Sequence, residues 1–119
     1  MEMVREFTFE AAHRLPLVAE DHTCARLHGH SYRVDVTVSG EVPGERGWVG
    51  DFGEIEAALQ PLREELDHRY LNEVPGLENP TSEVLARWIW DRLSAALPLS
   101  SVTVRETAAS GYVYRGARP

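Results

Sequence analysis

Two segments of the chain, residues 4–13 and 28–38, alternate between apolar and polar residues. A period of two is typical of a half-buried β-strand, because successive side chains of a strand point to opposite faces. The apolar face of the first segment ends in a histidine, and that of the second begins with two. The faces are Phe7, Phe9, Ala11 and His13 in the first segment, and His28, His30, Tyr32, Val34, Val36 and Val38 in the second. The sequence therefore predicts two strands with histidines at the ends of their core-facing sides.

The spacing of these histidines predicts a metal site. His28 and His30 are two positions apart, so on a strand both project from one face, about 7 Å apart. If the strands pair antiparallel through residues 14–27, the end of the first lies beside the start of the second, which brings His13 to the same place. Three imidazoles suit zinc and leave a fourth position for water or substrate, as in catalytic sites. The alternative is three ordinary strand histidines, and His22, in the polar connecting loop, is expected to be a solvated histidine.

The single cysteine, Cys24, lies in the same loop, four residues before His28. One cysteine cannot form an intrachain disulfide, and three histidines already supply the protein ligands of an open zinc site. Cys24 is therefore either a base or nucleophile near the metal, where positive charge favours its thiolate, or an inert buried cysteine.

Two further polar features stand out later in the chain. Asp67 and His68 are adjacent at the expected end of a helix, where a carboxylate can fix the tautomer of an imidazole. The pair could equally be a helix end with a histidine that favours the C-terminal dipole. Glu106 ends an apolar strand face, and a buried carboxylate there needs a partner. That partner is either an internal arginine or a ligand with two parallel N–H donors.

The first of two expected helices spans residues 52–66, where apolar residues recur every three or four positions. Asp51 can serve as its N-cap, and Pro61 should kink it.

The second helix is expected to begin with Asn79 as its cap and Pro80 as its first residue, and to stop at Pro98. Strands follow at residues 102–106 and 112–114. The resulting order ββααββ predicts an α+β domain with a four-stranded, mostly antiparallel sheet that carries two helices on one face.

The size and charge of the chain limit what it can be. Its 119 residues, 43% of them hydrophobic, predict a single domain over residues 1–119. A net charge of −7 argues against a general nucleic-acid or anionic-membrane binder. No uninterrupted apolar run approaches the roughly 18 residues of a membrane span, and the N-terminal residues do not resemble a signal peptide. We therefore expect a cytoplasmic protein.

Five stretches together resemble the 6-pyruvoyltetrahydropterin synthase family: FTFEAAHRLP, CARLHGHSY, GWVGDFGEIE, LDHRYLNEVPGLENPTSE and RETAASGYVYRG. The resemblance implies the tunnelling fold of that family, in which trimers close a barrel and two trimers stack into a hexamer. It also implies a zinc site formed by His13, His28 and His30, and a catalytic base at Cys24. His68, supported by Asp67, would be a second acid/base, and Glu106 would bind the pterin.

Only three residues separate Cys24 from His28, which favours the branch of the family that forms carboxytetrahydropterin in queuosine precursor biosynthesis. The substrate implied by the resemblance is 7,8-dihydroneopterin triphosphate, with Arg14, Arg26 and Arg69 as the arginines nearest the motifs. The alternatives are a pyruvoyl-forming enzyme, a folate-pathway lyase that cuts the pterin side chain, and a non-catalytic zinc-bound oligomeric module.

Overall fold

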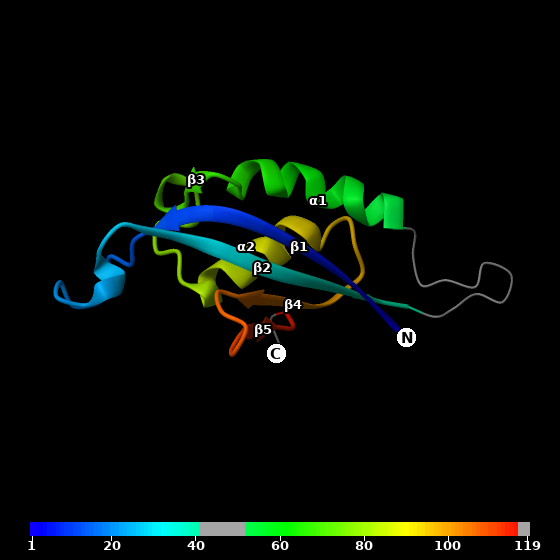
Figure 1. Cartoon of the computed structure of the whole chain (residues 1–119). Helices are drawn as coiled ribbons and strands as arrows, with labels where there is room; N and C mark the ends of the chain where they lie inside the picture. The colour runs from blue at the N-terminus through cyan, green and yellow to red at the C-terminus, as the bar shows by residue number, and fades with distance from the viewer. Residues whose placement is uncertain (41–51, 117–119) are drawn as a thin grey trace, which may run out of the picture.

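A computed structural model describes residues 1–40 and 52–116 of the chain. Its main elements form a five-stranded sheet in the order β3-β1-β2-β4-β5, together with two helices (Figure 1). The elements are β1 (Glu2–His13), η1 (Thr23–Ala25), β2 (His28–Ser39), α1 (Phe52–Leu66), β3 (Arg69–Tyr70), η2 (Leu71–Glu73), α2 (Ser82–Leu93), β4 (Leu99–Arg105) and β5 (Tyr112–Tyr114). The expected α+β class is confirmed.

The β1–β2 hairpin is the longest feature of the sheet and runs the length of the molecule (Figure 1). The two strands pair antiparallel along all twelve residues of each, from Glu2 opposite Ser39 to His13 opposite His28. Strand β4 pairs antiparallel with the other side of β2, so that Val34 lies opposite Val104. The predicted pairing of the first two strands is therefore correct.

Both helices pack on the face of the sheet to which the apolar residues of the strands point. Buried residues of α1 and α2, such as Leu59 and Ile89, join Phe9, Val34 and Val104 in one core. The opposite face carries mostly polar side chains, such as the exposed Glu6 and Arg33. Apolar burial on one face stabilises this two-layer arrangement and leaves the strand ends free to carry polar groups. No helix in the described part of the chain is both long and apolar enough to span a membrane.

The sheet has five strands rather than the expected four, because residues 69–70 add a short strand parallel to β1. Two residues are too few for an alternating pattern to reveal. The addition depends on His68, which takes a left-handed conformation (φ 58°) and donates its N–H to the carbonyl of Glu10 at 2.6 Å. This turn lays the chain along the edge of β1 directly after α1.

Helix α2 begins and ends at residues other than those predicted. Thr81, not Asn79, is its N-cap: its side chain accepts the N–H of Val84 at 3.1 Å. The helix ends at Leu93, short of Pro98, and the N–H groups of residues 96 and 97 both donate to the carbonyl of Leu93 in the turn that follows. That turn places the side chain of Leu97 against the core.

Helix α1 continues through Pro61 without a break, with the proline ring on its exposed side. The predicted cap of this helix, Asp51, lies outside the described residues.

Candidate metal centre and active site

Three histidines meet where the β1–β2 hairpin enters its connecting loop. Pairing places His13 opposite His28, and His30 follows two residues along the same face of β2. Nε2 of His13 lies 2.9 Å from Nε2 of His28 and 3.0 Å from Nε2 of His30. One ligand atom from each residue falls within 4.8 Å of the others. The predicted convergence is therefore confirmed.

The second nitrogen of each ring faces a backbone carbonyl. A carbonyl oxygen can only accept a hydrogen bond, so each Nδ1 carries the proton and donates it. The lone pair of each Nε2 is then free and turned toward the shared point. The pairs are His13 with Pro80 (2.9 Å), His28 with Arg26 (2.7 Å) and His30 with Ser31 (3.3 Å).

This donor set fits a divalent metal ion. Lone pairs that face one another repel unless a cation lies among them or one ring takes a second proton. A second proton on His13 is disfavoured, because the ring is 2% exposed and burial is the main cause that lowers its pKa. The nitrogen ligands of a tetrahedral zinc ion lie roughly 3.3 Å apart. The distances of 2.9 and 3.0 Å from His13 to the other two rings are close to this spacing. His13, His28 and His30 could therefore hold a metal as three neutral imidazoles.

Glu106 directly follows β4 and turns its carboxylate toward this cluster. Its Oε1 accepts a hydrogen bond from Oγ of Ser82 at 2.8 Å and lies 3.9 Å from Nε2 of His30. The side chain is 36% exposed. The internal arginine that we considered is not found, since no arginine among residues 1–40 and 52–116 makes an ion pair with Glu106. A hydroxyl supports the carboxylate instead, which leaves acceptor capacity for a ligand.

Cys24 lies in η1, the short 3-10 turn inside the loop that joins β1 to β2. The residue is half-buried, and its carbonyl accepts the N–H of Leu15 at 2.8 Å. Its thiol does not belong to the group of converging ligand atoms. The structure therefore brings the histidines together and leaves the sulfur outside their cluster.

Asp67 and His68 form a pair at the outer edge of β1. Oδ2 of Asp67 lies 3.0 Å from Nδ1 of His68, whose ring is 79% exposed. Oδ1 of Asp67 accepts the backbone N–H of Glu10 at 2.9 Å, which is the main reason that the pKa of Asp67 is lowered. The ionised carboxylate thus faces a ring nitrogen, which fits the first of the two interpretations of this pair. His68 lines a surface pocket that also borders on His30.

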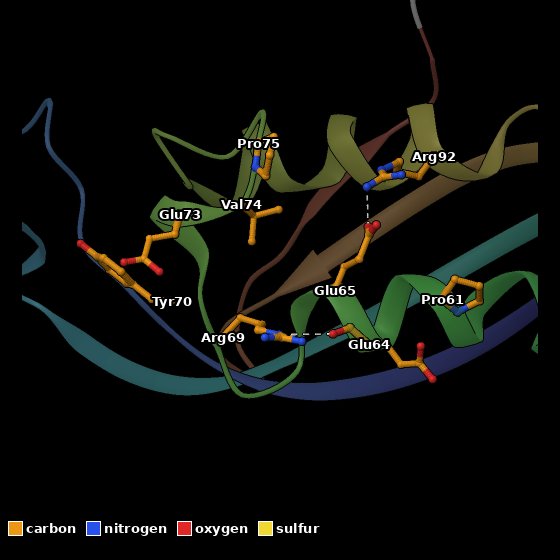
Figure 2. A pocket seen from close by; sticks show the side chains of 9 residues that line it. All are labelled: Pro61, Glu64, Glu65, Arg69, Tyr70, Glu73, Val74, Pro75 and Arg92. Carbon is orange, nitrogen blue, oxygen red and sulfur yellow. Dashed lines mark hydrogen bonds and ion pairs between the residues drawn. The ribbon is translucent and has the colours of Figure 1, made fainter.

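A different pocket, of about 660 Å³, opens between the end of α1, the η2 segment and α2 (Figure 2). Arg69, one of the candidates for binding triphosphate, lies here and donates from Nε to the carbonyl of Glu64 at 3.4 Å. Arg92 is paired with Glu65. With Glu73 also in the lining, carboxylates outnumber the guanidinium groups. Arg69 also lines the other pocket, which borders on His30 and His68.

The sequence patterns did not reveal the residues that form hydrogen bonds to the predicted site residues. Ser82 is buried, and nothing in its sequence context connects it to Glu106, which lies 24 positions away. Tyr32, whose hydroxyl lies 2.9 Å from Nδ1 of His13, could have been found because it shares the parity of His28 and His30. Burial raises the pKa of Tyr32, so the hydroxyl keeps its proton.

Comparison with known proteins gives matches along nearly the whole chain. The profile of the 6-pyruvoyl tetrahydropterin synthase family matches residues 2–117. A Synechocystis protein named 6-carboxy-5,6,7,8-tetrahydropterin synthase is 46% identical over 96% of this chain and 92% of its own. A Pyrococcus furiosus protein named dihydroneopterin monophosphate aldolase is 36% identical over 76% of this chain and 73% of its own.

The fold has close counterparts among solved structures. The 6-pyruvoyl tetrahydropterin synthase of Caenorhabditis elegans superposes with a TM-score of 0.90 at 28% sequence identity. The superposition covers 98% of this chain and 96% of the other. Sequence and architecture agree, and the chain belongs to the 6-pyruvoyl tetrahydropterin synthase family.

Proposed function

We propose that this protein is a zinc-dependent 6-carboxy-5,6,7,8-tetrahydropterin synthase. It would convert 7,8-dihydroneopterin triphosphate and water into 6-carboxy-5,6,7,8-tetrahydropterin, acetaldehyde and triphosphate, as a step toward the precursor of queuosine. The observation that carries this choice is the 46% identity, over almost the full length, to the Synechocystis relative whose name specifies the product. The short spacing between Cys24 and His28 favours the same branch of the family.

The histidine cluster would hold the zinc ion through its three Nε2 atoms and leave a fourth position for substrate. A zinc ion there supplies Lewis acidity, which lowers the pKa of substrate hydroxyls and stabilises negative charge that develops on oxygen. The carbonyls behind the rings keep each Nδ1 protonated, so that neutral nitrogens face the ion.

Glu106 would grip the pterin ring. Its two oxygens match the two parallel N–H donors of the 2-amino and N3 edge, a paired and charge-assisted contact. The carboxylate is partly exposed and lies beside His30, so a ring held by its oxygens would lie close to the histidine cluster.

Proton transfer is assigned to Cys24 and to His68. A thiolate near the bound metal can accept a proton, and an imidazole can take up or release one near neutral pH. The ionised carboxylate of Asp67 would keep the proton of His68 on Nδ1, which leaves its Nε2 available for exchange with substrate. The exposed position of His68 allows access from the pocket that borders on His30.

The partner proposed for each chain is further copies of itself, arranged as a hexamer of two trimers. Strand β5 lies at one edge of the sheet, with Tyr112 and Val113 about half exposed. An exposed edge strand invites pairing with another chain, and closure into a barrel removes such edges.

The second candidate function is cleavage of the side chain as in the Pyrococcus relative, or retention of a pyruvoyl group as the family name describes. Incubation of the purified protein with 7,8-dihydroneopterin triphosphate separates the possibilities by product. We expect acetaldehyde together with carboxytetrahydropterin. Glycolaldehyde would identify an enzyme that cuts the pterin side chain as an aldolase does, and a retained pyruvoyl group would identify a pyruvoyl-forming enzyme.

His28→Ala should abolish metal binding, because two imidazoles and water hold zinc far more weakly than three imidazoles. Elemental analysis should give roughly one zinc per wild-type chain and almost none in the variant. His22→Ala is the matched control, since this histidine lies in the loop that precedes His28 but outside the cluster. Normal zinc content in His28→Ala would contradict the assignment.

Glu106→Gln should weaken pterin binding roughly tenfold or more, because the amide loses the charge and one of two acceptors. Fluorescence titration with neopterin measures the dissociation constant, and zinc content should stay normal. Glu6→Gln, the same change on the opposite face of the sheet, serves as the control. Unchanged neopterin affinity in Glu106→Gln would remove Glu106 from the pterin site.

Cys24→Ala should keep its zinc, because the sulfur is not among the converging ligand atoms. Acetaldehyde formation should fall by a factor of about 100 or more, the usual scale for a positioned acid or base. A variant that loses zinc would instead identify the thiol as a metal ligand.

A further inference from the structure

The turn that carries Cys24 is capped by the side chain of His22. Nδ1 of His22 accepts the backbone N–H of Cys24 at 3.0 Å, and its own carbonyl accepts the N–H of Ala25 at 3.0 Å. His22 has the extended backbone of an N-cap (φ −69°, ψ 137°). The expectation of a free, solvated histidine was therefore incomplete: the ring is exposed, but one nitrogen is engaged.

Besides this cap, two contacts hold the turn against the base of the loop. The N–H of Leu15 donates to the carbonyl of Cys24, and Nε of Arg14 donates to the carbonyl of Ala25 at 3.2 Å. Both contacts come from the residues that directly follow His13. The loop therefore ties the cysteine to the end of β1, at the metal cluster. Of the three contacts, only the cap bonds the N–H of the cysteine itself.

We propose that His22 is a positioning residue that fixes the backbone of Cys24, and with it the direction of the thiol, for proton transfer. This inference rests on the proposed role of Cys24. A residue at the start of a 3-10 turn has an N–H without a backbone partner inside the turn, so the His22 cap is the contact that holds the N–H of Cys24. Without the cap, the backbone dihedrals of Cys24 are less restrained, and the sulfur no longer keeps one distance from the substrate.

The contact needs an acceptor rather than a charge. Nδ1 can accept only when its lone pair is free, so the ring carries its proton on Nε2. An asparagine in the same position offers a carbonyl oxygen to the same N–H and is a preferred N-cap. Alanine has no side-chain acceptor for this N–H. Comparison of His22→Asn with His22→Ala therefore tests whether the hydrogen bond of the cap, rather than the histidine itself, is required.

The first measurement is steady-state formation of acetaldehyde by the intact, zinc-loaded protein. His22→Ala should lower kcat roughly fivefold, the factor that corresponds to about 1 kcal/mol for a lost cap. KM should stay close to that of the wild type, because His22 does not contact Glu106, the proposed pterin ligand. His22→Asn should restore kcat. Asp21→Ala, which removes a charge from the same loop and keeps the cap, is the control.

The second measurement does not depend on turnover. Cys24 is the only cysteine in the chain, so alkylation by iodoacetamide reports on this thiol alone. At about pH 10, an ordinary thiol with a pKa near 8.5 is ionised, and the rate of alkylation then reflects access to the sulfur. His22→Ala should react severalfold faster than the wild type because the half-buried thiol is released. His22→Asn should react at the wild-type rate.

Two results would overturn the proposal: unchanged kcat and alkylation rate in His22→Ala, or failure of His22→Asn to restore them. A failure of the proposed function has a different signature. The wild-type protein would then give a product other than acetaldehyde, or Cys24→Ala would keep full activity, whatever the alkylation rates of the His22 variants.

Discussion

The antiparallel pairing of β1 with β2 is the constraint on which the rest of the site depends. Its register sets His13 opposite His28 and Ala11 opposite His30. A shift by one residue would move every side chain of one strand to the other face and scatter the histidines. The buried phenylalanines and valines of the same strands oppose such a shift, because it would expose them to water. The apolar core thus holds the metal ligands in register.

The start of α2 links the metal cluster to Glu106, the proposed pterin ligand. The carbonyl of Pro80 accepts from Nδ1 of His13, and the hydroxyl of Ser82 donates to Glu106. One turn of chain therefore orients a metal ligand and a substrate ligand together. Thr81, between them, caps the helix and keeps this turn in place. Helix packing against the sheet consequently has a direct effect on the geometry of the site.

Much of this arrangement could be predicted from residue patterns. Period-two alternation predicts β1 and β2, and the parity of the histidines predicts where they meet. The predictions that failed concerned local details of the backbone. Asn79 looked like a cap, but the first helical hydrogen bond runs from Leu85 to Thr81, and only the backbone path of residues 79–81 decides this. The two-residue strand β3 carries no periodic signal.

The sequence by itself determined the fold class, the convergence of His13, His28 and His30, and the separation of Cys24 from that cluster. These features follow from strand periodicity and from the number of ligands available. Only the tertiary structure decided which groups stand behind the site residues: Pro80 behind His13, Ser82 beside Glu106, and Glu10 on Asp67. Such contacts join segments far apart in the chain, and their geometry depends on how helices and loops pack, which no local pattern encodes.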